Sequence, residues 1–121
     1  MKWTALSDEL SLTVEDLKRY IKVNMWRKST GFFDFMDRLV RTYLGKGVLE
    51  AFFSEPRKVY EALLNYYGDE ETAGFMFKYQ LILPVAMKID GVDIVDELYK
   101  LALNNPEKFI RRLKEFGVKG L

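Results

Sequence analysis

The sequence predicts an all-α protein, a single-domain bundle of six or seven helices packed around a central apolar helix at about residues 70–90. Apolar residues recur along most of the chain at the three- and four-residue spacing of a helix face, and no stretch alternates with period two for long enough to indicate a strand. The segment 70–90 is apolar nearly all round, which indicates a helix buried among several others. A length of 121 residues is that of one domain, so we expect residues 1–121 to form a single unit.

The first helix is predicted at about residues 14–28, and the second runs from Phe32 to Gly45. Thr13 and Asp16 form a capping pair at the start of the first helix, because each side chain can bond the backbone N–H of the other residue. Glycine is a frequent helix end, which places the end of the second helix at Gly45. The apolar face of the first helix consists of Val14, Leu17, Ile21 and Met25.

A short third helix is predicted at about residues 48–53, and a fourth runs from Pro56 to Gly68. Proline favours the first position of a helix, because its missing N–H would have no partner there. The fifth and central helix carries Pro84. Since proline donates no hydrogen bond and its ring clashes with the preceding turn, we expect a kink at Pro84 that frees the carbonyl of Gln80.

The sixth and seventh helices are predicted at about residues 94–103 and 106–117. Placing Pro56 on Pro106 aligns this pair with the third and fourth helices at a shift of 50 residues. The echo predicts a duplicated unit of helix, proline and helix. The alternative is that two capped amphipathic helices look alike because the chemistry of helix starts and stops is limited.

The chain has no cysteine and no histidine, and its 19 basic and 18 acidic side chains leave a formal net charge of +1. Without these two residue types, thiol nucleophiles, disulfides, histidine triads and zinc sites with Cys or His ligands are excluded. A net charge near zero gives no overall electrostatic attraction to nucleic acid or to an anionic membrane. We therefore expect a protein that is not an enzyme and that carries no cofactor.

The sequence also predicts a cytoplasmic location and no contact with a membrane. Residues 1–8 contain no apolar stretch of the length that a secretory signal requires. The most apolar stretch, residues 75–87, is well short of the roughly 20 apolar residues of a membrane span. A single glutamine, no cysteine and plentiful Lys and Glu resemble the composition of hyperthermophile proteins and predict a thermophilic source.

A run of short motifs in the middle of the chain resembles a known family. Tyr43-Leu44-Gly45, then Glu55-Pro56, Ala62-Leu63 and Tyr67-Gly68 lead into a long apolar helix. This order is similar to that of the Nitrosopumilus output domains, which are small archaeal all-helical domains, over roughly residues 43–88. The resemblance implies an archaeal signal-output or regulatory module and carries over no catalytic residues.

Three carboxylates, Asp90, Asp93 and Asp96, lie within about two helical turns. In principle they would project together toward a hard cation such as Mg²⁺, which makes a carboxylate-metal hydrolase the second alternative function. Helix capping is the simpler interpretation, with Asp93 as N-cap and Asp96 at the third helical position. We accordingly expect no metal.

The ends of the chain are basic and the middle is acidic, which supports nucleic-acid binding as the first alternative function. If the fold brings the two basic ends together, their side chains would contact phosphates, with Trp26 as a stacking surface. A solvated helix face is the ordinary interpretation of such clusters. The candidate residues are Lys18, Arg19, Lys22, Arg27 and Lys28 near the N-terminus, and Arg111, Arg112 and Lys114 near the C-terminus.

Aromatic residues are numerous, and several form adjacent pairs that one helix face cannot hide, because neighbours point about 100° apart. The leading prediction is a protein-interaction or regulatory module that binds a protein partner or a second copy of itself through exposed aromatics. A thick aromatic core is the alternative, and an apolar pocket beside Pro84, near Tyr79 and Gln80, is a further one. The candidate partner-binding residues are Phe32, Phe52, Tyr66 and Tyr67.

Overall fold

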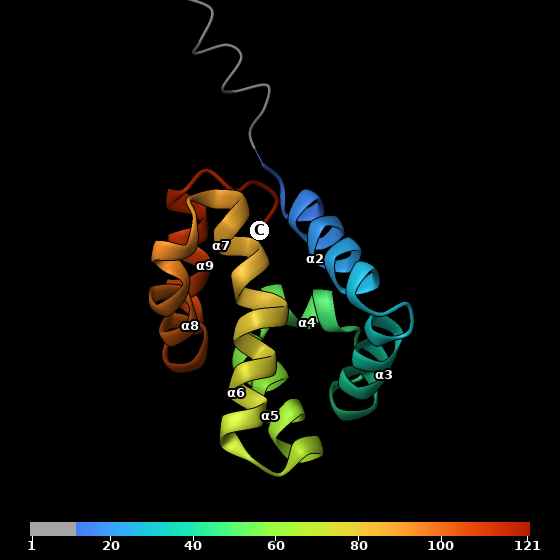
Figure 1. Ribbon diagram of the computed structural model, residues 1–121. Helices are drawn as coiled ribbons and strands as arrows, with labels where there is room; N and C mark the ends of the chain where they lie inside the picture. The colour runs from blue at the N-terminus through green and yellow to red at the C-terminus, as the bar shows by residue number, and fades with distance from the viewer. Residues whose placement is uncertain (1–11) are drawn as a thin grey trace, which may run out of the picture.

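A computed structural model describes residues 12–121, and the described chain is all-α, as the sequence predicts. A π-helical turn at Lys78–Ile82 (η1) joins two of the helices into one central helix, and a 3₁₀ turn at Val92–Ile94 (η2) follows it (Figure 1). With the central helix taken as one, the described residues form seven helical segments. The α-helices are α2 (Val14–Lys28), α3 (Phe32–Leu44), α4 (Val48–Ser54), α5 (Pro56–Tyr67), α6 (Glu70–Phe77), α7 (Leu83–Ile89), α8 (Val95–Asn104) and α9 (Pro106–Glu115).

Between residues 12 and 121 there is no β-strand, and an isolated parallel bridge pairs Thr13 with Lys119. None of the helices in this range is both long enough and apolar enough to cross a membrane. The predicted lack of a secretory signal concerns residues 1–8, which lie outside the described residues.

Local capping chemistry sets several of the helix ends. The hydroxyl of Thr13 accepts a hydrogen bond from the Asp16 N–H at 3.1 Å, and the Asp16 carboxylate accepts one from the Thr13 N–H at 3.0 Å, so the predicted capping box is confirmed. Gly45 ends α3 at φ 83° and Gly68 ends α5 at φ 70°, in the left-handed region that glycine adopts without a steric penalty.

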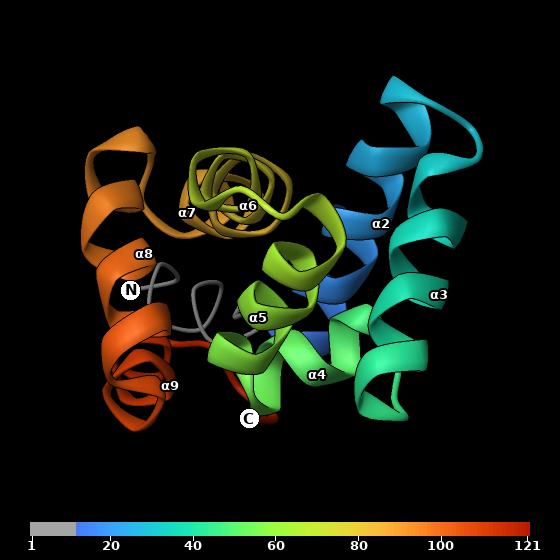
Figure 2. The same cartoon turned by 90° about the horizontal axis from the view of Figure 1, so that it is seen from below.

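The central helix stands between two pairs of helices. Figure 1 shows α6, η1 and α7 as one column, with α2 and α3 on one side and α8 and α9 on the other. Figure 2 looks along this column and shows α5 and α4 on a single side of it. In agreement with both views, α7 contacts α2, η1 contacts α8, and α6 contacts α5.

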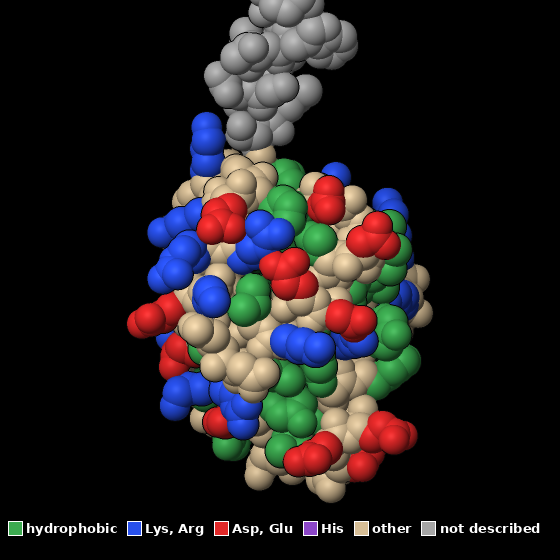
Figure 3. Space-filling model, turned by 90° about the vertical axis from the view of Figure 1, so that its left-hand side faces the viewer, with side chains coloured by type: hydrophobic (Ala, Val, Ile, Leu, Met, Phe, Trp, Pro, Cys, Tyr) green, Lys and Arg blue, Asp and Glu red, His purple; other side chains and the backbone are tan. Residues whose placement is uncertain are grey.

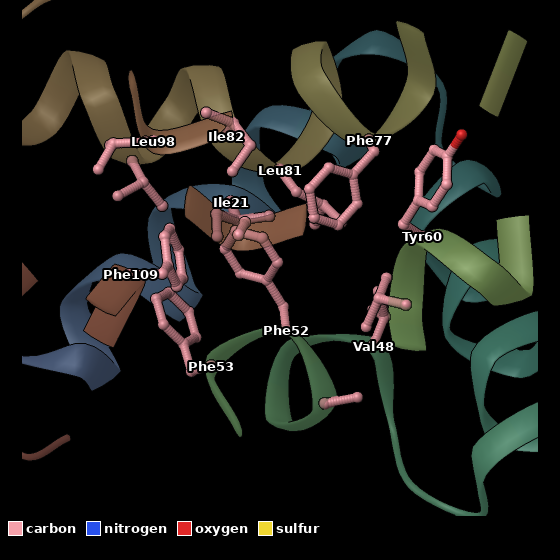
Figure 4. Packing of buried hydrophobic residues seen from close by; sticks show 14 of the residues in the cluster. Ile21, Val48, Phe52, Phe53, Tyr60, Phe77, Leu81, Ile82, Leu98 and Phe109 are labelled. Carbon is pink, nitrogen blue, oxygen red and sulfur yellow. The ribbon is translucent and has the colours of Figure 1, made fainter. Parts of the chain in front are cut away.

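The buried side chains form one cluster with members from every helix, as expected for a single domain. At its centre Phe52 of α4 lies between Phe77 of the central helix and Phe109 of α9 (Figure 4). The ring centroids of Phe52 and these two residues are 5.7 and 5.6 Å apart, in edge-to-face arrangements. No polar or charged side chain is buried in the part of the chain that the structure describes.

The central helix accommodates Pro84 through the π-helical turn directly before it. The N–H of Leu83 donates to the carbonyl of Lys78, five residues back instead of four. Such a turn contains one extra residue, and it is a common way for a helix to adapt where the regular ladder is interrupted. Pro84 lacks an N–H and is itself buried. The predicted kink at Pro84 stays a prediction.

The two helix–proline junctions of the predicted duplication have similar backbone geometry. Glu55, between α4 and α5, has φ −140° and ψ 63°, and Asn105, between α8 and α9, has φ −152° and ψ 77°. A residue before proline is pushed out of the helical region, which accounts for both joints without common ancestry. The joints also touch, because Arg57 donates to the carbonyl of Leu103 at 3.0 Å. The duplication itself stays a prediction.

Stability is expected to fall as the pH drops below about 4, where free carboxylates take up protons. Hydrogen bonds from Thr72 hold the pKa of the Asp69 carboxyl below its ordinary value, and an ion pair with Lys78 does the same for Asp96. A group with a lowered folded-state pKa stabilises the protein above its unfolded pKa, and this contribution is lost as the pH falls through the folded value. Thermal unfolding midpoints measured across this range test the expectation.

Asp69→Asn should lower the midpoint at neutral pH and flatten its dependence on pH. Asp34 provides the control, since it also lies in the first turn of a helix, but its carboxylate forms no side-chain hydrogen bond or ion pair in the range 12–121. Asp34→Asn is expected to leave the profile unchanged, and an equal flattening by both substitutions would contradict the assignment.

Candidate interaction surface

A shallow apolar hollow of about 350 Å³ lies between α3 and α5, and we call it the α3–α5 groove. Phe35, Leu39 and Tyr43 line it from α3, because residues four apart share a helix face. Ala62 and Tyr66, again four apart, line it from α5. Helices that are separated in the chain by α4 thus present two apolar stripes to one hollow.

The walls of the groove are exposed aromatic rings. Tyr66 is 56% exposed and Tyr43 is 47% exposed, values that are high for large apolar side chains. The ring of Phe35 meets that of Tyr66 edge-on with centroids 5.2 Å apart, which fixes the orientation of the Tyr66 ring over the groove. Large rings with restricted motion are typical of surfaces that bind proteins.

Arg38 adds a positive charge to the same groove. It lines the hollow and is exposed, and it forms no ion pair with any described residue. By contrast, Arg41 on the same helix pairs with Asp37 at 3.2 Å. Thr42 and Asn65 complete the polar part of the lining. The groove therefore combines apolar walls with one cation that is free to bind an acidic group.

The structure separates the four predicted partner-binding residues. Tyr66 lines the groove, whereas Tyr67 is half-buried against the core. Burial raises the pKa of the Tyr67 hydroxyl, and the neighbouring Tyr66 hydroxyl contributes to the same shift. Phe32 is half-buried and also packs against the core. Phe52 is fully buried among other rings, so its prediction as a surface residue is wrong. The short helix α4 is buried on more than one face, because Val48, Ala51 and Phe53 are buried as well, so both members of the Phe52-Phe53 pair are hidden.

Phe35 and Tyr43 are not among the residues that the sequence predicts to bind a partner. The spacing of Phe35, Leu39 and Tyr43 is visible in the sequence, and it marks a second apolar face beside the buried one that contains Met36 and Val40. Two apolar faces on one helix indicate two neighbours. In the described residues the face with Met36 and Val40 packs against the core, and the face with Phe35, Leu39 and Tyr43 borders the groove.

The fold does not bring the two predicted basic clusters together. Lys18, Arg19, Lys22, Arg27 and Lys28 lie on α2, and Arg111, Arg112 and Lys114 lie on α9, on opposite sides of the central helix (Figures 1 and 2). The joint phosphate-binding surface that nucleic-acid binding required is therefore absent from the described part of the chain.

Several of these basic side chains are also neutralised. Lys18 pairs with Glu15 and Arg19 with Asp16, both at 3.3 Å. Arg112 binds the carboxylates of Glu97 and Glu115, which raise its pKa. Figure 3 shows the corresponding face of α8 and α9, where basic and acidic side chains alternate. Such a mixed surface gives weak attraction for a polyanion.

The three carboxylates of the predicted metal alternative are not gathered into a site. No group of three acidic side chains close enough to hold a metal ion occurs within residues 12–121. Asp96 instead pairs with Lys78 at 2.6 Å. Asp93 is not an N-cap as predicted, because it lies inside η2, which begins after Gly91. The tight 3₁₀ turn moves the start of α8 past Asp93.

The predicted apolar pocket beside Pro84 has no counterpart among the five principal hollows of the described chain. None of them includes Pro84, Tyr79 or Gln80. Pro84 is buried and Tyr79 points outward, being 38% exposed. The hollow with the largest apolar walls is instead the α3–α5 groove.

Comparison of the chain with protein-family models, with curated proteins and with solved structures gives no significant match. The resemblance of residues 43–88 to the Nitrosopumilus output domains therefore stays a prediction.

Proposed function

We propose that this protein is a non-enzymatic interaction module that binds an apolar segment of a partner protein in the α3–α5 groove. The observation that carries the proposal is the set of exposed rings, Tyr43 and Tyr66 above all, around an apolar hollow. Rings that stay in water cost solvation free energy, and a partner that covers them recovers about 25 cal/mol for each Å² of apolar area buried. Their burial would therefore drive association.

Arg38 specifies the chemistry of the partner segment. An arginine without an acidic neighbour in the described chain favours a carboxylate beside the apolar contact. The expected ligand is thus an apolar segment with an acidic residue next to it. The same proposal assigns the module to the cytoplasm of a thermophilic archaeon. The composition supports the thermophilic source, the family resemblance supports the archaeal one, and the lack of an apolar signal stretch in residues 1–8 supports the cytoplasm.

Tyr66→Ser and Arg38→Glu are expected to lower the yield of a captured partner by about tenfold, equivalent to roughly 1.4 kcal/mol of binding free energy. The tagged protein is used to capture partners from a lysate of its source organism, with and without nuclease treatment, and the retained protein is quantified by mass spectrometry. Thermal unfolding of each variant checks that it is folded.

Two matched controls lie away from the groove. Trp26 is 58% exposed, close to the value for Tyr66, so Trp26→Ser removes an equally exposed ring from α2. Arg111→Glu reverses an exposed charge on α9. Both controls should retain the partner. Equal retention by the two groove variants would refute the proposal, and loss of all retained material on nuclease treatment would support nucleic-acid binding instead.

A further inference from the structure

The outer face of the central helix carries an apolar stripe that is separate from the α3–α5 groove. Phe75, Tyr79, Leu83 and Met87 follow one another at intervals of four residues, and we call them the outer stripe. Phe75 is 56%, Tyr79 38% and Met87 54% exposed, and Leu83 is half-buried. The rings of Phe75 and Tyr79 lie against each other with centroids 4.7 Å apart.

The π-helical turn brings these four side chains into line. In a regular α-helix each step of four residues overshoots a full turn by about 40°, so three steps would spread the side chains over about 120°. The extra residue of η1 takes back about 100°, the rotation of one residue. The first and last side chains then lie about 20° apart and all four lie within about 60°, so the stripe runs along one side of the helix. The opposite side of the same helix carries Phe77, Leu81 and Val85, all fully buried.

No described helix covers the outer stripe. In Figure 1 the column α6–η1–α7 stands in front, and in Figure 2 it lies at the edge of the bundle, with α5 and α4 behind it. Its contacts with α2, α5 and α8 involve the other sides of the helix. An apolar stripe along an exposed helix is typical of a surface on which another helix packs, and no described helix of this chain packs there.

The two ends of the outer stripe carry opposite charges. Glu70 and Glu71 are exposed beside the Phe75 end. Lys88 lies beside the Met87 end, where it faces the ring of Tyr20 at 4.9 Å, and Arg27 borders the same hollow. Within residues 12–121 none of these four charged side chains forms an ion pair. Asp90 is also exposed at the Met87 end, so that end holds two basic side chains and one acidic side chain, whereas the Phe75 end holds Asp69 as well as the two glutamates. The surface is therefore acidic at one end, apolar along its length and, with a net positive charge, basic at the other end.

We propose that a second copy of this chain docks on the outer stripe, with the two central helices antiparallel about a two-fold axis between Tyr79 and Leu83. This arrangement places the acidic end of each copy on the basic end of the other, so that Glu70 and Glu71 meet Lys88. Phe75 then packs on Met87 of the other copy, a favourable contact of a ring with a thioether. The surface is self-complementary, as a two-fold interface requires. A parallel pairing would juxtapose like charges.

The dimer goes beyond the proposed function, because the outer stripe and the α3–α5 groove share no residue. Sedimentation equilibrium over a range of protein concentrations should show a monomer–dimer equilibrium. Tyr79→Glu is expected to weaken dimerisation by about tenfold or more, because it places a charge at the centre of the interface. Phe75→Ser, at a more exposed position, should act in the same direction. Circular dichroism of both variants establishes that they are folded.

Tyr66→Glu is the matched control, since it places the same charge on an exposed tyrosine in the groove and should leave dimerisation unchanged. Charge reversal tests the antiparallel order. Glu71→Lys and Lys88→Glu should each weaken the dimer, and the double variant should restore it, because the two ends then exchange signs. A monomer at every concentration, or a dimer that Tyr79→Glu does not weaken, overturns the proposal. Failure of the double variant to restore the dimer overturns the antiparallel order.

Discussion

Replacing Phe52 by alanine is expected to lower the free energy of unfolding by about 3–5 kcal/mol, the range for a large buried ring. Phe52 is fully buried, and its ring meets those of Phe53, Phe77 and Phe109 at 5.0, 5.7 and 5.6 Å. These neighbours belong to three different helices, so they cannot all move in to fill the cavity. Urea denaturation measures the loss, which should appear as a lower midpoint with an unchanged slope.

Tyr66→Ala is the control for this prediction. The Tyr66 ring is 56% exposed and makes edge-on contacts with Phe35 and Tyr67, so its removal should cost less than about 1.5 kcal/mol. If the two variants were equally destabilised, Phe52 would not be the centre of the core. The comparison also separates the two roles of aromatic residues in this chain, because Phe52 supports the fold and Tyr66 faces solvent.

The positions of the helices were predictable because the signals that set them are local. The first helix was predicted at about 14–28, and α2 spans Val14–Lys28. Its start depends on Thr13 and Asp16, whose mutual hydrogen bonds join residues three apart. Likewise, Pro106 begins α9 because proline fits the first position of a helix wherever it occurs.

Interactions between distant residues were not predictable in this way. The spacing of four residues between Asp37 and Arg41 is that of an ion pair on a helix surface, and the two side chains pair at 3.2 Å. The same carboxylate also accepts a hydrogen bond at 2.9 Å from the N–H of Val48, at the start of α4. This second role depends on how α3 and α4 meet, and no spacing rule within one helix describes it.

The candidate surfaces show the same limit. Periodicity identifies Tyr66 as an aromatic that one face of a helix does not hide, but the groove exists only because α3 packs beside α5. The outer stripe depends on the extra residue of η1, since an unbroken α-helix would wind Phe75 and Met87 about 120° apart. The spacing of four residues therefore does not by itself predict a straight apolar stripe, because the alignment also requires the π-helical turn.

Gly91→Ala is expected to lower the free energy of unfolding by about 1–3 kcal/mol through the backbone alone. Gly91 links α7 to η2 with φ 128° and ψ −176°, a conformation that is essentially restricted to glycine. Its N–H donates to the Ala86 carbonyl at 2.7 Å, which holds the link in place. A Cβ atom built on Gly91 would have no neighbour within 4 Å, so a collision with other atoms cannot explain a loss.

Gly31→Ala is the control for the effect of backbone conformation, because a Cβ atom on Gly31 would also have no neighbour within 4 Å. Gly31 precedes α3 with φ −95° and ψ −4°, a conformation that residues other than glycine adopt at the third position of type I turns. Its substitution should change the free energy of unfolding by less than about 1 kcal/mol in either direction, since reduced entropy of the unfolded chain opposes the loss of a glycine N-cap. Equal losses at the two glycines would contradict the conformational explanation. A loss confined to Gly91 would instead establish that the backbone conformation of the link between α7 and η2, and not the missing side chain, requires glycine there.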